Sequence, residues 1–143
     1  MIQKDIEICA NACWAFSHLT NVDDKYLDKV VTHHLILRLA ALCDHKELHI
    51  RVPAVRSIGN ILSGKDEYTY KFIEAGILKK LDLLLGTKKC GFRREVIWAI
   101  SNILANDSNT VAKVLVSSNI MPKLLAMMMS DIDDVNIFFT NLI

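Results

Sequence analysis

Trp98 and Asn102 lie four residues apart in segment 93–104, RREVIWAISNIL, and their side chains offer complementary chemistry. If the segment is helical, both side chains emerge on one face, because residues i and i+4 lie one above the other. An indole provides an apolar wall for the stem of Lys or Arg and attracts its cation, whereas an amide donates and accepts hydrogen bonds. Taken alone, the pair is better explained as a partly buried core Trp beside a solvated Asn.

A second group with possible chemistry is the segment CDHKELH, which contains Cys43, His45 and His49. Two His residues four apart on a helix can bind zinc. The repeat described below places this segment in a loop, and no further ligand cluster completes a site, so we predict solvated histidines, no metal site and no cofactor. The cysteines lack CxxC or disulfide-framework spacing and are expected to be reduced thiols: Cys9, Cys13, Cys43 and Cys90.

Catalytic motifs are missing from the sequence. It contains no Gly-rich phosphate loop, no nucleophile elbow and no pair of acids in settings that separate their roles, so we predict that the protein is not an enzyme. Seventeen Lys and Arg residues face 16 Asp and Glu residues, which gives no bulk attraction to nucleic acid or a membrane. The start lacks a secretory signal and charges interrupt the apolar runs, which predicts a soluble intracellular protein.

Comparison of the chain with itself reveals a repeat. Three segments align without gaps at one constant offset: 6–20, 48–62 and 90–104. Trp14 and Trp98 share one repeat position, and Arg56 occupies it between them. A period of about 42 residues, without the alternation typical of strands, predicts a stacked helical repeat.

The stretches between these segments each predict a short helix, a break and a second apolar helix. The breaks are expected at His33–His34, Ala75–Gly76 and Ser118–Asn119. Gly76 and Asn119 suit the left-handed backbone that ends a helix. Each repeat therefore consists of three helices, of which the third is the longest.

These patterns predict one all-α domain over residues 1–143. We expect a partial repeat 1–20, repeats 21–63 and 64–105, and a partial repeat 106–143, about three repeats in all with both ends incomplete. Because stacked repeats bury their apolar faces only against neighbours, open ends expose apolar surface, and we expect self-association or poor solubility unless further repeats continue.

The segments ACWAFSHLT, AVRSIGNILSGKDEYTYKFIEAG and EVIWAISNI, together with the repeat period, resemble the importin alpha family, whose armadillo repeats bind nuclear localisation signals. The most specific part is RSIGNILSGKDEYT, where Arg replaces the usual Trp before Gly-Asn. That match implies repeats from the second half of the family's right-handed armadillo solenoid. It also implies a protein of the cytoplasm and nucleus that acts in nuclear import.

The resemblance implies that the third helices line a concave groove for an extended basic peptide. Trp98 corresponds to a stacking ridge, Asn102 to a peptide-backbone clamp and Glu95 to an acidic partner of the minor signal site. Arg56 and Asn60 match the repeat in which the family's series of Trp residues is interrupted. Leu62, Gly64 and Thr69 match the positions that surround one bound Lys, and Ser101 is a weaker candidate beside Asn102. The implied peptide-binding residues are Trp98, Asn102, Glu95, Ser101, Arg56, Asn60, Leu62, Gly64, Thr69 and Trp14.

Some positions depart from the family pattern. His18 replaces a Tyr, and Asn11 and Asn21 replace Asp, which removes two negative charges from the groove floor and should weaken attraction to a basic peptide. In the last repeat a gapless register puts Asn141 at the Trp position. In that register Val135 takes the position of Ile8 in the first repeat. A rival register makes Asn141 the clamp and Asp134 the acid, with Ile137 in place of Trp.

The implied partners are basic signal peptides of cargo proteins, not nucleic acid or a membrane. Importin beta is implied only through a basic N-terminal arm, which in the family lies upstream of the matched repeats, as does the major signal site. Two alternatives remain open: a general armadillo scaffold that binds a helix or an acidic segment, or a truncated importin alpha paralogue without transport activity.

Overall fold

The computed structural model describes residues 2–21, 24–105 and 109–129, and all regular structure within these ranges is α-helical. The helices are α1 (Ile2–Leu19), α2 (Asp24–Leu27), α3 (His33–Leu42), α4 (Leu48–Leu62), α5 (Asp66–Glu74), α6 (Ile77–Leu85), α7 (Cys90–Leu104), α8 (Asn109–Val116) and α9 (Ile120–Met129). The long helices α4 and α7 begin and end at equivalent repeat positions, which confirms the predicted stacked helical repeat.

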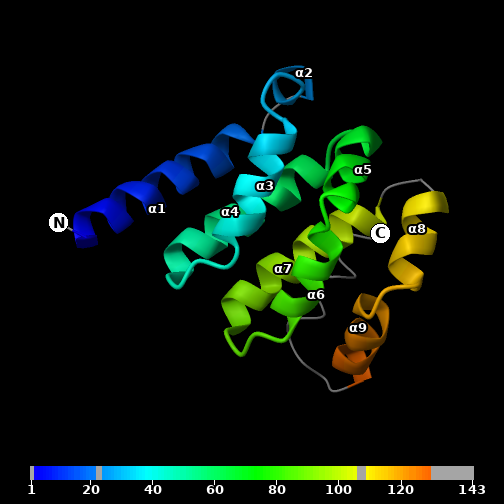
Figure 1. The fold of residues 1–143 in the computed structure, drawn as a ribbon. Helices are drawn as coiled ribbons and strands as arrows, with labels where there is room; N and C mark the ends of the chain where they lie inside the picture. The colour runs from blue at the N-terminus through cyan, green and yellow to red at the C-terminus, as the bar shows by residue number, and fades with distance from the viewer. Residues whose placement is uncertain (1, 22–23, 106–108, 130–143) are drawn as a thin grey trace.

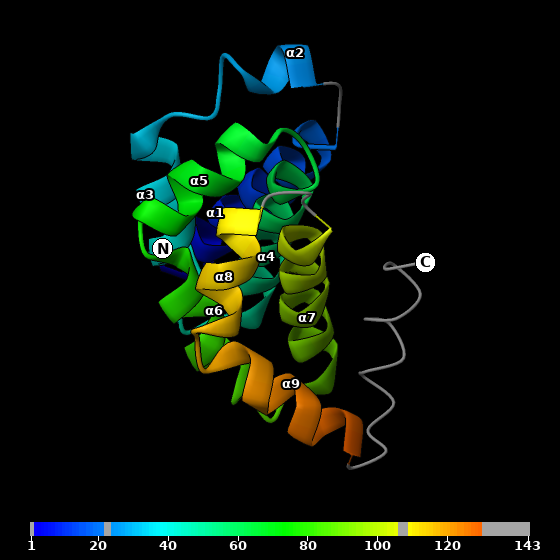
Figure 2. The same ribbon diagram turned by 90° about the vertical axis from the view of Figure 1, so that its right-hand side faces the viewer.

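The three long helices form one layer of the molecule. Helix α4 packs between α1 and α7, and Figure 1 shows the three side by side. The shorter helices α3 and α6 cover α4 and α7 respectively. Figure 2, seen from the side of α8 and α9, shows these two helices continuing the stack beyond α6 and α7. The repeat boundaries at residues 21, 64 and 106 stay a prediction.

The core lies between the layers, because α4 and α7 are buried on more than one side. Ile58 and Ile61 of α4 have no exposed surface, and neither do Ile97 and Ile100 of α7. Apolar side chains at spacings of three and four on both helices therefore contact neighbours on two sides. This explains why neither helix shows a single narrow apolar stripe.

Two of the three predicted breaks are confirmed. Gly76 adopts φ +80° between α5 and α6, a conformation that is strained for residues with a Cβ atom, and the chain also breaks between α8 and α9. The break expected at His33–His34 instead lies before His33, because α2 ends at Leu27 and α3 begins at His33. Thr32 caps that helix, and its hydroxyl accepts a hydrogen bond from the Leu35 N–H at 3.2 Å.

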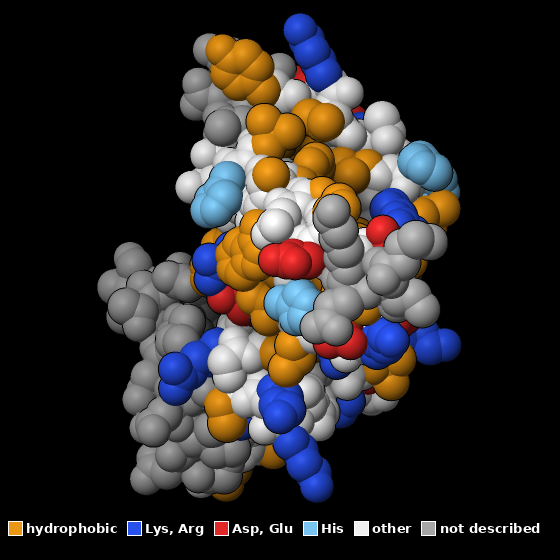
Figure 3. Space-filling view, turned by 90° about the vertical axis from the view of Figure 1, so that its left-hand side faces the viewer, with side chains coloured by type: hydrophobic (Ala, Val, Ile, Leu, Met, Phe, Trp, Pro, Cys, Tyr) orange, Lys and Arg blue, Asp and Glu red, His pale blue; other side chains and the backbone are white. Residues whose placement is uncertain are grey.

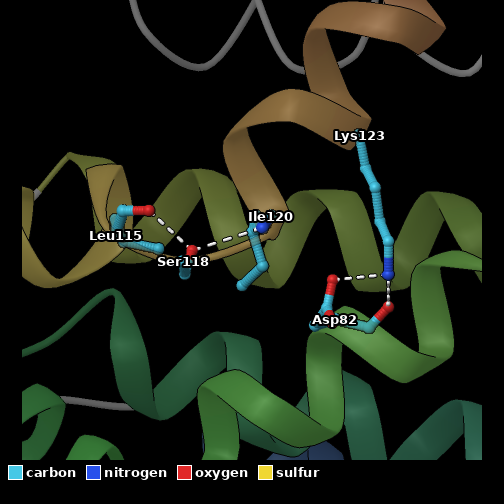
Figure 4. A network of polar contacts seen from close by, with 5 residues as sticks. All are labelled: Asp82, Leu115, Ser118, Ile120 and Lys123. Carbon is cyan, nitrogen blue, oxygen red and sulfur yellow. Dashed lines mark hydrogen bonds and ion pairs between the residues drawn. The ribbon is translucent and has the colours of Figure 1, made fainter.

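Ion pairs join the second helices of successive repeats. Lys123 of α9 reaches Asp82 of α6, where its Nζ lies 2.6 Å from Oδ1 and 3.1 Å from the backbone oxygen (Figure 4). Lys80 of α6 forms an ion pair with the side chain of Asp44, which follows the C-cap of α3. Figure 4 also shows Ser118 at the α8–α9 corner, where its hydroxyl bonds to the chain on both sides.

Within the described ranges no single helix is long and apolar enough to cross a membrane. Helices α8 and α9 reach that length and apolarity only when they are taken together, and the angle between them at the break is 72°.

Candidate functional site

A cavity of about 760 Å³ lies over the long helices α1, α4 and α7. We call this cavity the groove. Its lining comes from all three helices and the turn after α1: Ser17, His18, Asn21, Arg56, Asn60, Gly91, Arg94, Glu95 and Trp98. The stacking of long helices thus brings together four residues that the sequence pointed to, namely Arg56, Asn60, Glu95 and Trp98.

Arg56 of α4 and Glu95 of α7 form an ion pair inside the groove. The Nε of Arg56 donates to Oε2 of Glu95 at 3.1 Å, and Nη2 donates to Oε1. The hydrogen bond to Glu95 raises the pKa of Arg56. Because Arg56 pairs with Glu95, the implied acidic partner of a peptide is already neutralised by the chain itself, and its side chain is only 16% exposed.

Arg56 also lies against an aromatic ring. Its Cζ is 5.5 Å from the ring centroid of Trp14 on α1, a distance that permits cation–π attraction. Trp14 is half-buried, does not line the groove, and lies 6.3 Å from the ring of His18. Arg56, which takes the repeat position of Trp14 and Trp98, therefore contacts the long helices on both sides of α4, namely α1 and α7.

Trp98 packs on the backbone of α4 at Gly59. A Cβ atom at Gly59 would lie 2.7 Å from Cε3 of Trp98 and nearer still to Cζ3, well inside van der Waals contact. Glycine at this position lets the indole approach the preceding long helix closely. The half-buried ring is thus both a wall of the groove and part of the contact between α4 and α7.

The two asparagines that match the family pattern make the same bond one repeat apart. Nδ2 of Asn102 donates to the Gly59 carbonyl at 2.8 Å, and Nδ2 of Asn60 donates to the Ser17 carbonyl at 2.8 Å. Asn60 also donates to the Thr20 hydroxyl at 3.1 Å. The amide nitrogens therefore join successive long helices. The recurrence of Asn at one repeat position is the sequence signal for this role, but it does not by itself identify the bonding partner.

The remaining implied site residues do not line the groove. Leu62, Thr69 and Ser101 are buried, and the Ser101 hydroxyl donates to the Trp98 carbonyl at 2.8 Å. Gly64 is half-buried in the turn before α5, and Asn102 also lies outside the lining. The implied surroundings of a bound Lys at Leu62, Gly64 and Thr69 therefore stay a prediction.

The groove is not acidic. Among the described residues, its charged lining consists of two cations, Arg56 and Arg94, and one carboxylate, Glu95, which pairs with Arg56. His18 and Asn21, where the family has Tyr and Asp, both belong to the lining, whereas Asn11 does not. Three lining residues were not predicted from the sequence: Ser17, Gly91 and Arg94.

Metal ligands are not gathered anywhere in the described part of the chain, where no three His, Cys, Asp or Glu side chains could hold an ion. His45 lies in a loop, and its Nδ1 accepts from the Glu47 N–H at 3.1 Å. His49, predicted in the same loop, instead lies in the first turn of α4. All four cysteines are free thiols, and burial raises the pKa of Cys43 to about 12.

The alternative registers of the last repeat concern Asp134, Val135, Ile137 and Asn141, which lie outside the described residues. Neither register is therefore tested, and the position of a second ridge after Trp98 stays a prediction.

No family model matches the chain. The chain is 32% identical over 120 residues to importin subunit alpha-1a of Oryza sativa subsp. japonica, a match that covers 83% of this chain and 23% of the relative. It is also 32% identical over 95 residues to importin subunit alpha-3 of Arabidopsis thaliana, covering 66% of this chain and 18% of the relative. The chain thus matches about a fifth of the length of these curated relatives.

Solved structures show the same architecture. A designed armadillo repeat protein in complex with the peptide (KR)4 is 26% identical, with a TM-score of 0.84, and the match covers 96% of this chain and 59% of that chain. A second designed armadillo repeat protein has a TM-score of 0.83 at 23% identity, covering 93% of this chain and 56% of that chain. The predicted all-α armadillo solenoid is therefore confirmed.

Proposed function

We propose that this chain, an armadillo-repeat homologue of the importin alpha subunits, is a peptide-binding adaptor whose groove holds an extended basic segment of a cargo protein for nuclear import. The observation that carries the proposal is the groove itself, which spans three long helices and places Trp98 beside Glu95. The corresponding partner class is the basic signal peptide, and the corresponding location is the cytoplasm and nucleus.

The chemistry of binding follows from the positions of these two side chains. The indole of Trp98 provides an apolar wall for the alkyl stem of a Lys residue, and the Glu95 carboxylate receives its ammonium group. An incoming Lys must share Glu95 with Arg56, which already donates to both carboxylate oxygens. The Arg56 side of the pair is partly exposed, so exchanging its cation for a peptide ammonium group gains only about 0.2–1 kcal/mol, and we expect weak binding.

The asparagines contribute less than a complete backbone clamp. Since Nδ2 of Asn60 bonds to the Ser17 carbonyl, a bound peptide meets mainly the amide oxygen, which accepts from a peptide N–H. Asn60 lines the groove, whereas Asn102 does not. We therefore assign the backbone contact in the groove to Asn60 ahead of Asn102.

A second candidate function is a general armadillo scaffold that binds segments without a preference for basic charge. The observation that favours it is the pairing of Glu95 with Arg56, which leaves the groove without an uncompensated carboxylate among its described lining residues. The two candidates differ in the charge that the bound segment must carry.

Titration of a labelled Lys-rich peptide, followed by fluorescence anisotropy at about 50 and about 200 mM salt, tests the proposal. The first function predicts binding that weakens with salt, is lost with Trp98→Ala and is absent for a peptide with Ser in place of Lys. Leu83→Ala, which truncates an exposed side chain on α6, is the matched control and should bind normally. Equal binding of the Lys and Ser peptides supports the scaffold function instead.

A further inference from the structure

The loops before α4 and α7, with the first turns of these helices, carry a concentration of positive charge. Segments 45–51 and 87–94 contain six Lys and Arg residues and one carboxylate, that of Glu47. The rest of the chain holds eleven Lys and Arg residues against fifteen Asp and Glu residues. We call these six cations the basic rim: Lys46, Arg51, Lys88, Lys89, Arg93 and Arg94. The nearly neutral net charge of the chain conceals this local excess.

The basic rim is built by the repeat. Lys46 and Lys88 occupy equivalent repeat positions, and so do Arg51 and Arg93, so stacking places equivalent cations in neighbouring loops. Figure 1 shows the loops that lead into α4 and α7 at the same edge of the molecule. Arg51 links the two repeats directly, because its Cζ lies 4.4 Å from the ring centroid of Phe92. Figure 3 shows Lys and Arg side chains gathered on the lower half of one face.

Backbone carbonyls position two guanidinium groups of the basic rim. Nε of Arg51 donates to the Cys43 carbonyl at 3.0 Å, and Nη1 of Arg93 donates to the Thr87 carbonyl at 3.1 Å. Lys46, Lys88 and Lys89 lie at the surface. None of these three Lys side chains forms an ion pair with a described residue. Lysine cations that pair with no acid among the described residues, beside guanidinium groups held in place, favour an anionic partner.

We propose that the basic rim binds an acidic peptide segment, with Asp or Glu side chains spaced to meet the cations of two successive repeats. An extended strand alternates its side chains, so a segment lying across both loops presents carboxylates at regular intervals to one side. The rim also adjoins the groove, because Gly91 and Arg94 line it. An acidic stretch that flanks a groove-bound segment therefore reaches the rim.

A peptide fits the basic rim better than a nucleic acid. Single-stranded nucleic acids bind through exposed aromatic platforms as well as cations. Phe92 is the only Phe, Tyr or Trp residue of these segments, and it is only 3% exposed and lies under Arg51. The described part of the rim therefore offers charge without an exposed Phe, Tyr or Trp ring, and its remaining rings are the smaller imidazoles of His45 and His49. This site does not depend on Trp98 or Glu95, so its test is independent of the test of basic-peptide binding in the groove.

Anisotropy titration of a labelled Asp- and Glu-rich peptide against the whole chain tests the site. The double variant Lys88→Glu/Lys89→Glu should weaken binding about tenfold or more, because two attractions become repulsions. The matched control is Lys79→Glu/Lys113→Glu, which changes net charge equally at exposed positions on α6 and α8 and should bind within about twofold of wild type. Trp98→Ala should leave acidic-peptide binding unchanged.

Three outcomes overturn the proposal. One is an equal loss of binding in both double variants, which reflects net charge alone. Another is the absence of binding to the wild-type chain at about 50 mM salt. The third is binding of a single-stranded oligonucleotide of equal charge when the acidic peptide does not bind. Binding of the acidic peptide without binding of the Lys-rich peptide supports the rim and contradicts the basic-peptide function.

Discussion

Arg56 on α4 and Glu95 on α7 are joined by two hydrogen bonds, one of them from Nε to Oε2 at 3.1 Å. The arginine takes the repeat position that Trp14 and Trp98 occupy in the neighbouring long helices. A cation of the chain itself thus holds the acid that a bound Lys would need. The pair controls how much negative charge the groove presents.

Arg56→Gln should strengthen binding of a Lys-rich peptide about threefold to fivefold, because Glu95 becomes available to the peptide ammonium group. The free energy of unfolding should fall by about 1 kcal/mol or less, since the Arg56 side chain is partly exposed. Peptide anisotropy and urea denaturation measure the two effects. Arg38→Gln, an exposed change on α3, is the control and should alter neither. Weaker peptide binding in Arg56→Gln would contradict the role given to Glu95.

Gly59→Ala should lower the free energy of unfolding by about 1–3 kcal/mol, because the new methyl group overlaps the Trp98 ring. The displaced indole should also change its fluorescence spectrum. Gly91→Ala is the matched control on α7, where nothing lies within 4 Å of an added Cβ and alanine favours the helix. Equal stability of the two variants would show that Trp98 does not pack on Gly59 in solution.

Asp28→Asn should reduce stability near neutral pH and leave it unchanged in strong acid. Hydrogen bonds from Lys65 and Tyr68 lower the pKa of Asp28 below its ordinary value of 3.8. A lowered folded pKa stabilises the native state above pH 3.8, and this stabilisation is lost as pH falls through the folded value. Thermal melts across this pH range should therefore converge for the two proteins. Glu74→Gln, at the exposed end of α5, should show no such convergence.

The exposed apolar side chains of α1 should make the chain self-associate. Ile8 is 58% exposed, whereas the equivalent Ile50 and Phe92 are 0% and 3% exposed, and Leu19 is 51% exposed. Apolar positions that are covered on α4 and α7 are open on α1, and exposed apolar patches favour association. Ile8→Glu/Leu19→Glu should shift light scattering toward the monomer, while Leu83→Glu, at an exposed apolar position of α6, should not. A wild-type chain that is monomeric at high concentration would contradict this expectation.

Much of the architecture follows from the sequence. The repeat offset predicts the positions of α4 and α7, and Gly76 marks a left-handed break because only residues without a Cβ atom adopt it readily. The start of α3 at His33 differs from the prediction, and Thr32 caps the helix there through its hydroxyl. Local signals of this kind suffice because each repeat reuses the same apolar spacing.

The partners of the polar groups were decided only by the tertiary structure. The sequence could place Arg56, Asn60, Glu95 and Asn102 on a shared surface, but each of these side chains can bond to water, to a peptide or to the next helix. Helices α4 and α7 approach closely at Gly59. Their polar groups therefore bond to each other: Asn102 of α7 donates to the Gly59 carbonyl of α4, and Glu95 of α7 accepts from Arg56 of α4. The period determines which residues are neighbours, whereas the distance between the helices determines which bonds form.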